Sequence, residues 1–338
     1  METHHRVIFP VGHGGFAFEN IGNTNVIFDC GSDTAPSRVE MYIDLLNAHG
    51  VTHIDYLFIS HFDKDHVNAL AYLKNHLTIK NVFVPMIPKN YRILYNASTQ
   101  GAYNAIMNIF QENREIELIE ISEQARRFDR TQPTKPLWEW DITNMLSITD
   151  LANLATEMTN EGIDVDSLDD VDYVSDCRGD INKAVISTFG PMGPNSKGLI
   201  VLSQKTQNAQ VISNHLEQGP CCVLTVLNVA NNDATDCLYV GDANLSRSKN
   251  IKDVQKFFVK YNAITPLLLM QVPHHGSQNN ILNTFDTDFP AEYYFVHDIS
   301  DARIQKKVTV YNVLHSKNQL LMVRDVCHDL ILGRIEVQ

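Results

Sequence analysis

The sequence predicts a mixed α/β fold in which stacked sheets are covered by helices. Two observations support this class. Short apolar runs rich in Val, Ile and Phe alternate with stretches of helical periodicity along much of the chain. The chain has 338 residues, of which 44% are hydrophobic and 20% charged, a composition typical of a globular protein with a sizeable core.

The first part of the chain is predicted to be rich in strands. Its apolar runs are short and are separated by Gly and Asn. A helix with apolar residues at helical spacing then ends at Gly50. The elements expected here are strands over 6–10, 15–20, 25–29, 55–60 and 81–86, and helices over 37–49 and 67–77.

The segment of about 88–197 is less regular. Residues 102–113 look helical and 115–121 alternate like a strand. Residues 161–180 are rich in Asp but lack the Gly and Glu of an EF-hand loop, so they are interpreted as a solvated acidic loop. Regular patterns then resume, with strands expected over 198–203, 221–229, 235–241, 266–272, 292–297, 320–324 and 330–337, and helices over 251–261 and 308–314.

Composition narrows the class of protein. No apolar stretch approaches the roughly 18 residues of a membrane span, and the N-terminus lacks the apolar region of a secretory signal. The six cysteines form no CxxC pair, which favours a reducing cytoplasm. The net charge of −13 argues against nonspecific nucleic-acid binding over the whole surface. It leaves room for an anionic substrate, because two divalent ions would add about four positive charges to a site.

The most informative motif directly follows the strand expected at 55–60. Residues 60–66 read Ser-His-Phe-Asp-Lys-Asp-His, and four of them can bind a metal ion: His61, Asp63, Asp65 and His66. A tight loop would turn these side chains toward one centre. The motif therefore predicts a metal-dependent enzyme.

Two further strand ends carry ligand side chains. Gly241 and Asp242 end one apolar strand, where the glycine allows a tight turn and the carboxylate lies at the sheet edge. Another strand runs into Pro-His-His-Gly-Ser, which contains His274 and His275. Together with the first motif these residues suffice for two metal ions joined by a bridging carboxylate, an arrangement used in hydrolysis.

In this order, the three motifs resemble the metallo-β-lactamase fold superfamily. The match is closest to the ComEC-like branch, which typically shows SHxDxDH, then Gly-Asp, then PHHGS. Residues 11–15 and 28–32 also resemble the family's opening strands, with His13 where Gln is usual. The resemblance implies an αββα sandwich that forms a single hydrolase domain over 1–338, with about 88–197 as an insertion.

For the first metal, the resemblance implies His61 and Asp63 as ligands and Asp242 as the bridge to the second. The superfamily's third ligand here is usually a His before a mid-chain strand. His215 and Asn214 are the two candidates in this sequence.

For the second metal, the resemblance implies Asp65, His66 and His274. His275 would face the substrate or serve as an outer ligand, although the order of the two histidines is left open. Asp29 would orient the ligands from behind. Gly-rich flanks could also bring His13 to the metals, and a loop histidine without a role is the alternative.

The identity of Asp63 bears on the reaction. A carboxylate is a harder ligand than imidazole, so it shifts preference from zinc toward manganese or magnesium and suits phosphoryl substrates. The predicted function is that of a bacterial phosphodiesterase or nuclease acting on DNA, RNA or a small nucleotide. A metal-activated hydroxide would attack the phosphodiester, and His275 or a metal-bound water would protonate the leaving group.

Two alternatives remain at this stage. The same site could cleave an ester, lactone or thioester, against which Asp63 argues. The chain could instead be a non-catalytic scaffold or sensor that keeps the fold while the 88–197 segment binds a protein partner. The full set of ligand residues argues against this second alternative.

Overall fold

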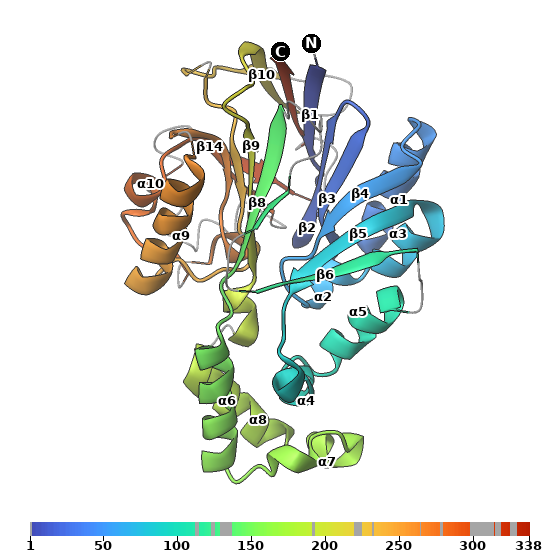
Figure 1. Ribbon diagram of the computed structural model, residues 1–338, viewed down its shortest axis with the longest axis vertical. Coiled ribbons are helices and arrows are strands. Elements are labelled where there is room, and N and C mark those ends of the chain that lie inside the picture. The colour runs from blue at the N-terminus through green and yellow to red at the C-terminus, as the bar shows by residue number, and fades with distance from the viewer. Residues whose placement is uncertain are drawn as a thin grey trace.

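Two stacked β-sheets with helices on both outer faces form the αββα sandwich of the computed structural model (Figure 1). The residues that the structure describes are 2–111, 115–122, 126–128, 137–190, 193–219, 225–231, 233–263, 265–277, 280–297, 314, 319–324 and 330–338. The expected fold class is confirmed. Among the described residues, no helix is long and apolar enough to cross a membrane.

The first sheet contains both termini of the chain. Within the described residues its strand order is β11-β10-β16-β1-β2-β3-β4-β5-β6, with β3 to β6 pairing in parallel. Its strands are β1 (Glu2–Ile8), β2 (Gly14–Ile21), β3 (Thr24–Ser32), β4 (His53–Phe58), β5 (Thr78–Pro85), β6 (Glu117–Ile121), β10 (Val211–Gly219), β11 (Thr225–Leu227) and β16 (Leu330–Val337).

The second sheet is built from the middle and the C-terminal part of the chain. In the described residues its order is β15-β14-β13-β12-β9-β8-β7, and β12, β13, β14 and β15 are parallel. Its strands are β7 (Arg126–Phe128), β8 (Trp138–Asn144), β9 (Leu199–Lys205), β12 (Cys237–Tyr239), β13 (Leu267–Gln271), β14 (Ala291–His297) and β15 (Leu320–Val323).

Helices cover the two outer faces and extend the molecule at one end (Figure 1). α1 (Pro36–Ala48), α2 (Lys64–Val67), α3 (Leu70–His76) and α5 (Ala102–Gln111) lie on the side of the first sheet. α9 (Ser248–Tyr261) and α10 (Phe285–Asp288) pack on the second sheet. The remaining helices lie at the lower end in Figure 1: α4 (Arg92–Ser98), α6 (Ile148–Asn160), α7 (Val171–Asp176) and α8 (Arg178–Phe189). Four short 3-10 helices join the described elements: η1 (Lys89–Tyr91), η2 (Val165–Ser167), η3 (Gly193–Lys197) and η4 (His274–Gly276).

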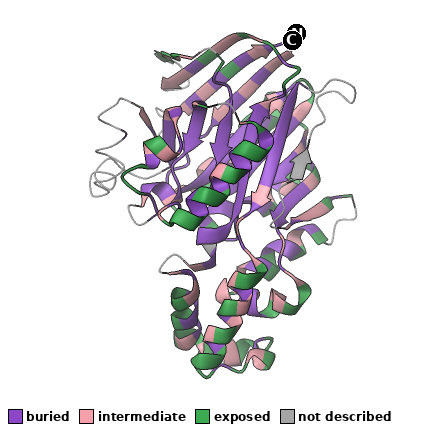
Figure 2. Ribbon diagram, turned by 60° about the vertical axis from the view of Figure 1, so that its left-hand side comes forward, coloured by how far each residue is buried: buried purple, intermediate pink, exposed green. Residues whose placement is uncertain are grey.

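Burial follows the layers. The strands of both sheets are largely buried, whereas the helices expose their outward faces (Figure 2). Aromatic side chains from both sheets meet between them, as in the stack of Phe28 on Tyr239 at 3.8 Å between ring centroids. This stack links β3 to β12, the strands that lead into Asp29 and Asp242. The layer between the sheets therefore fixes the relative position of residues that enter the site from opposite sides.

A buried ion pair also joins the sheets. Arg6 donates to Glu19 at 2.7 Å, and both side chains are fully buried. Tyr239 and Trp140, from the second sheet, donate to the same carboxylate at 2.9 Å each. Because the buried charges are paired and hydrogen-bonded, the network specifies one alignment of the two sheets rather than leaving a charge unpaired.

The segment of about 88–197 contributes to both sheets. β6 closes one edge of the first sheet, and β8 pairs with β9 along its whole length. The helices α6, α7 and α8, called here the helical extension, project from the sandwich (Figure 1). The division into one domain over 1–338 with an insertion at about 88–197 stays a prediction.

The acidic segment 161–180 is helical where a loop was expected. It contains η2, α7 and the first turn of α8. Asp164 accepts a hydrogen bond from the backbone N–H of Asp166, and Asp170 accepts from those of Asp172 and Tyr173. The aspartates therefore begin short helices, a role that Asp takes because its side chain satisfies free N–H groups at a helix start.

Most elements expected outside this segment are confirmed with small shifts of their ends. The helix expected over 67–77 is divided into α2 and α3, and α2 begins at Lys64, so Asp65 and His66 lie on a helical turn. Of the strand expected over 221–229, β11 covers Thr225–Leu227, and 220–224 lie outside the described residues. The helix expected over 308–314 also lies outside them except for Leu314.

Candidate metal centre

Five chain segments meet at one edge of the two sheets. β3 and β4 are parallel neighbours in the first sheet, and β12 and β13 are parallel neighbours in the second. The carboxyl ends of parallel strands lie on the same edge, so the residues that follow these four strands come together. The turn before β2 adds His13 to them. The three motifs identified in the sequence thus converge at a single place.

One group of ligand atoms contains Asp65, His275 and His13, all within 4.8 Å of one another. Nε2 of His275 lies 3.0 Å from Oδ2 of Asp65, and Nε2 of His13 lies 3.7 Å from the same oxygen. The ring of His13 also packs on that of His275, with 3.9 Å between centroids. His13 is therefore at the site, in a position from which it could bind a metal ion or a substrate.

A second group contains His61, His66 and Asp242, again within 4.8 Å of one another. All three side chains are buried. Asp63 is more open, with 42% of its side chain exposed and Oδ2 at 4.0 Å from Nε2 of His61. Asp63 therefore lies at the solvent edge of this group.

Asp242 lies between the two groups. Its Oδ1 is 3.3 Å from Nε2 of His66 and 3.8 Å from Nε2 of His275. Its Oδ2 is 3.8 Å from Nε2 of His61. The two oxygens of one buried carboxylate thus face different histidines, the geometry that a bridging ligand requires.

Hydrogen bonds behind the site orient two of the histidines. Nδ1 of His66 donates to Oδ2 of Asp29 at 2.8 Å. Ser60 Oγ donates to the same Asp29 oxygen at 2.8 Å, and Nδ1 of His61 lies 2.9 Å from Ser60 Oγ, which leaves Nδ1 of His61 as the donor. Both rings therefore carry the proton on Nδ1 and present Nε2 to the site, the tautomer that a metal-binding histidine needs.

Two carboxylates of the site, Asp242 and Asp65, have pKa values below their usual value. Burial would raise the pKa of Asp242, but the neighbouring histidines, His66 first among them, hold it well below its usual value. Burial opposes ionisation of Asp65 in the same way, and His66 and His275 lower its pKa. Asp63 differs, because burial raises its pKa.

The two central histidines are shifted in opposite directions. Burial lowers the pKa of His61, and the neighbouring His66 lowers it further. Burial acts in the same sense on His66, but the carboxylates of Asp29, Asp65 and Asp242 outweigh it and raise the pKa of that ring well above its usual value. A concentration of negative charge around His66 is what a cation site provides.

The residues present fit divalent cations. Nε2 of His61 and Nε2 of His66 are buried, and neither makes a hydrogen bond of normal geometry within the described part of the chain. An unsatisfied buried polar atom costs about 1–3 kcal/mol. A cation between each nitrogen and the adjacent Asp242 oxygen would satisfy both. Two histidine nitrogens and several carboxylate oxygens form a donor set that manganese and zinc both accept.

Local backbone geometry supports this arrangement at some cost. Asp29, His274 and His275 have φ values of 53°, 47° and 49°, a left-handed conformation that non-glycine residues rarely adopt. Gly241 also has a positive φ, of 51°, and a Cβ there would lie 2.6 Å from Ser60 Oγ. Gln271 holds this turn, because its Oε1 accepts from the backbone N–H groups of Val240 and Gly241. Such strain at a cluster of ligand side chains indicates a functional site.

The two adjacent histidines occupy different positions, which distinguishes the two orders that the sequence left open. His275 is buried, and its Nδ1 donates to the carbonyl of His297 at 2.9 Å, which directs Nε2 to Asp65. His274 has 27% of its side chain exposed, and its Nδ1 lies 2.5 Å from Oδ2 of Asp242. The geometry therefore favours His275 as the ligand beside Asp65 and His274 as the residue open to substrate.

His215 is not part of this cluster. It is exposed on β10, where it pairs with Arg334 of β16, and β10 lies beside the termini at the opposite end of the sheets from α2 (Figure 1). Asn214 lies on the same strand and donates to the carbonyl of Ala234. The mid-chain strand that reaches the site is β9, whose Leu199 N–H donates to the Ser60 carbonyl at 2.7 Å. His215 was a candidate because it precedes the strand expected over 221–229, but it lies within a strand of its own, β10.

Sequence reasoning assigned no role to Gln271, and it considered His297 only as a strand-end residue that could line the site. The Nε2 of His297 lies 3.2 Å from the Phe9 carbonyl, which fixes the ring, and its own carbonyl orients His275. Both residues sit at the ends of apolar strands next to ligand motifs. A polar residue that ends such a strand was the signal available in the sequence.

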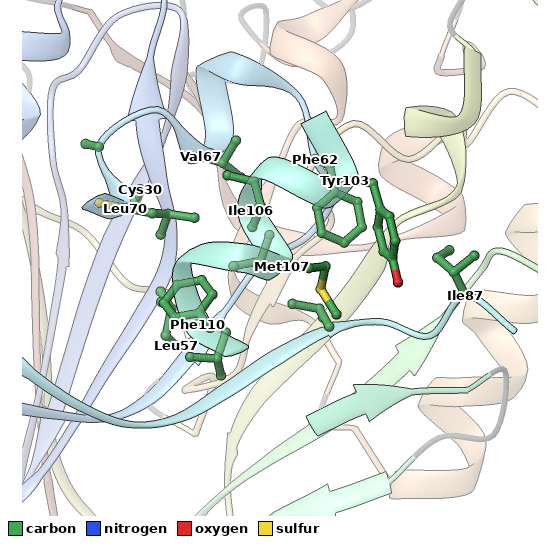
Figure 3. Close-up of a cluster of buried hydrophobic side chains, with 14 of the residues drawn as sticks. Cys30, Leu57, Phe62, Val67, Leu70, Ile87, Tyr103, Ile106, Met107 and Phe110 are labelled. Carbon is green, nitrogen blue, oxygen red and sulfur yellow. The ribbon is translucent and has the colours of Figure 1, made fainter. Parts of the chain in front are cut away.

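The loop that carries the ligands is fixed to the core by Phe62. Its side chain is fully buried, and its ring meets that of Tyr103 edge-on at 5.2 Å between centroids. Figure 3 shows Phe62 beside Tyr103 and Met107 of α5. Since His61 and Asp63 flank Phe62, this anchor turns them away from the hydrophobic cluster and toward the site.

Comparison with known proteins agrees with this geometry. Residues 17–99 match the family model of the metallo-beta-lactamase superfamily. The two-sheet sandwich with helices on both outer faces is consistent with the metallo-β-lactamase fold. The matched segment includes most of β2, all of β3 and β4, and the ligand-bearing loop after them. No curated protein matches the sequence.

Three solved structures with a related fold are similar at low identity. The metallo-β-lactamase fold protein YhfI from Bacillus subtilis is 10% identical, with a TM-score of 0.42 and 92% of each chain covered. The short form of human tRNase Z is 10% identical, with a TM-score of 0.42 over 88% of this chain and 94% of that one. CmlA, a diiron β-hydroxylase from Streptomyces venezuelae, is 10% identical, with a TM-score of 0.46 over 98% of this chain and 54% of that one. The chain thus spans about half the length of CmlA. At these scores the three carry no conclusion about activity.

Proposed function

We propose that this metallo-β-lactamase-fold protein is a phosphodiesterase that hydrolyses nucleotide phosphodiesters at a two-metal site. The observation that supports it most is the position of Asp242, whose two oxygens face separate sets of histidines. We place His61 and Asp63 at the first metal, and Asp65, His66 and His275 at the second. We also propose that the protein belongs to the ComEC-like branch, because residues 60–66 and 273–277 match the SHxDxDH and PHHGS motifs of that branch.

The ligand set favours phosphoryl chemistry. Asp63 stands where a third histidine is usual, and it adds a carboxylate beside the group of His61, His66 and Asp242, while Asp65 supplies the carboxylate of the other group. Hard oxygen ligands suit manganese or magnesium and substrates whose own oxygens are hard ligands. Divalent ions bound here would lower the pKa of a water and offset charge on the phosphoryl oxygens.

The chain's own residues supply orientation and a proton. Asp29 and Ser60 hold the rings of His66 and His61 with Nε2 forward. His274 lies partly open to solvent with Nδ1 on Asp242, so in its imidazolium form it can give the proton on Nε2 to the leaving oxygen and return to the neutral ring. His275 loses that role in this assignment, because both of its nitrogens have partners.

A manganese-dependent assay tests the proposal. Purified protein would be incubated with manganese and bis(4-nitrophenyl) phosphate, and in parallel with single- and double-stranded DNA and RNA. We expect hydrolysis, and we expect a metal chelator to abolish it. Asp242→Asn keeps the side-chain shape but removes the bridging charge, and we expect at least a roughly hundredfold loss of kcat. Asp253→Asn, an exposed change on α9, is the matched control. Full activity in Asp242→Asn would disprove the two-metal proposal.

A further inference from the structure

A cleft of about 530 Å³ opens at Asp63, beside the group of His61, His66 and Asp242. Three parts of the chain line it: the loop of Phe62, Asp63 and Lys64, the turn between α4 and α5, and the face of α8 with η3. Figure 1 shows α4 and α8 at the lower end of the molecule, below α2, which the loop of Phe62 to Lys64 leads into. Asp63 belongs both to the ligand cluster and to the wall of the cleft. A molecule held in the cleft would therefore reach the metal centre.

The walls of the cleft are polar but almost uncharged. Gln100 and Asn182 bring side-chain amides, and Ile186 adds an apolar surface that is 53% exposed. Gln100 Oε1 accepts from Arg178 at 2.5 Å, so its NH₂ group remains to donate. Amides beside an aliphatic surface match a nucleobase, which offers hydrogen-bonding edges and apolar faces.

Positive charge is scarce in the cleft. Lys64 is the only lysine or arginine among the described residues that line it, and its Nζ lies 3.4 Å from Oδ1 of Asp33 on the protein surface. A site that binds several phosphates uses a cluster of arginines and lysines. The cleft therefore suits the uncharged part of a substrate rather than a second phosphate.

The surroundings disfavour a long polyanion. The segment 157–183, which forms most of the helical extension, contains nine carboxylates and two basic residues. Most of these carboxylates are exposed. A nucleic-acid strand that continued from the cleft over this extension would meet repulsion within a Debye length of about 8 Å. A short nucleotide would end before it.

From these observations we propose that the cleft binds the nucleobase of a small nucleotide phosphodiester, of dinucleotide size, while the phosphodiester group lies at the metal centre. This inference rests on the proposed phosphodiesterase function. It assigns the α4–α5 turn and α8, from the segment that the sequence marks as an insertion, to substrate selection. Charge and size together thereby exclude long DNA and RNA as preferred substrates.

A substitution that fills the cleft tests the assignment. Ile186→Trp places a large ring over the cleft on an exposed helical position, so folding should be retained. With manganese we expect the KM for a dinucleotide to rise about tenfold, while kcat for bis(4-nitrophenyl) phosphate, which has no base, changes less than about twofold. Val259→Trp is the matched control, because Val259 is 79% exposed on α9 and does not line the cleft.

Binding without turnover separates this inference from the proposed function. Calorimetric titration with the four common nucleoside 5′-monophosphates should show binding of at least one to the wild-type protein and weaker binding to Ile186→Trp. If neither phosphodiester is cleaved but this difference in binding is seen, the proposed function fails and the nucleotide cleft stands. If bis(4-nitrophenyl) phosphate is cleaved while Ile186→Trp changes neither KM nor binding, the cleft assignment fails alone. Faster cleavage per bond of a long RNA than of a dinucleotide would overturn the size limit.

Discussion

Nε2 of His275 lies 3.0 Å from Oδ2 of Asp65, while Nδ1 of the same ring donates to the His297 carbonyl at 2.9 Å. The ring is thus fixed on one side by the backbone of β14 and faces the carboxylate on the other. His274, the adjacent residue, contacts Asp242 instead and is partly exposed. We expect His275→Ala to lose about one equivalent of bound manganese per chain. His274→Ala should retain both equivalents and lower kcat, because it removes a proton donor.

Metal content of the two variants, measured by mass spectrometry after gel filtration, distinguishes these roles. The control is His76→Ala, an exposed histidine at the end of α3. The opposite pattern, with loss of metal in His274→Ala alone, would make His274 the ligand and His275 the residue that faces substrate, the other order that the sequence allowed.

Asp29 is expected to set metal affinity without touching a metal. Its Oδ2 accepts hydrogen bonds from both His66 and Ser60. Asn tolerates the positive φ at this position, so Asp29→Asn should fold, but its NH₂ group cannot accept those bonds. Loss of such a partner typically lowers metal affinity about 10–100-fold. Asp55→Asn, which lies at the other end of β4, controls for the general loss of a carboxylate. Equal manganese affinity in Asp29→Asn and the wild-type protein would contradict this role.

Ser60→Ala should affect one metal more than the other. The Ser60 hydroxyl links Asp29 to Nδ1 of His61, whereas His66 contacts Asp29 directly. Removing the hydroxyl takes away the contact that keeps the proton of His61 on Nδ1, whereas His66 keeps its own contact with Asp29. We therefore expect a biphasic manganese titration in which only the weaker phase shifts. The titration is monitored by electron paramagnetic resonance of the bound ion. A uniform shift of both phases would show that Ser60 supports the whole loop.

The ligands could be predicted from sequence because each follows an apolar strand in a short motif. The order of His274 and His275 could not, because it depends on two successive positive φ values and on a carbonyl 22 residues further along the chain. The error at His215 has a related cause. β10 exposes residues on both faces, so it shows no alternation of apolar residues, and His215 was interpreted as preceding a strand rather than lying on one.

Strand β8, in the middle of the chain, was not predicted from the sequence for a different reason. β8 is buried on both faces, and it carries Glu139 and Asp141, charged residues that usually mark the surface. Gln204 of β9 donates to both carboxylates, at 3.1 Å and 2.6 Å, and this pairing makes their burial tolerable. A partner that far along the chain is invisible to a local pattern. Residue periodicity therefore failed where cross-strand polar contacts replace apolar ones.

Asp63 is expected to control metal preference. It lies at the open edge of the group of His61, His66 and Asp242, 4.0 Å from Nε2 of His61, where a longer ring can be accommodated. Asp63→His replaces a hard oxygen ligand by imidazole, so zinc affinity should rise and manganese-dependent phosphodiesterase activity should fall, each by about tenfold or more. Competition between zinc and manganese at fixed pH measures the change. Unaltered selectivity would show that Asp63 does not contact the metal.

His4 should make the free energy of unfolding depend on pH between about 4 and 6.5. It is fully buried, stacks on Trp138 at 3.9 Å and has its pKa lowered by that burial from 6.5 to about 4. As pH falls through 6.5, the unfolded chain binds a proton on His4 that the folded chain does not, so stability decreases. At pH 5 the loss is about 2 kcal/mol relative to pH 7.

Glu19, which lies beside His4, affects the free energy of unfolding in a lower pH range. Burial opposes its ionisation, but Arg6 and His4 hold its pKa below the usual value of 4.5, so its contribution is complete above 4.5 and is lost only as pH falls further. Urea unfolding of His4→Phe with chelator present should therefore show a smaller difference between pH 7 and pH 5 than the wild-type protein. His49→Phe, a change at an exposed histidine, should leave the wild-type difference intact. An equal difference between pH 7 and pH 5 in all three proteins would mean that His4 already binds its proton in the folded state. The Glu19 carboxylate, 3.3 Å away, would then be the group that stabilises the protonated ring.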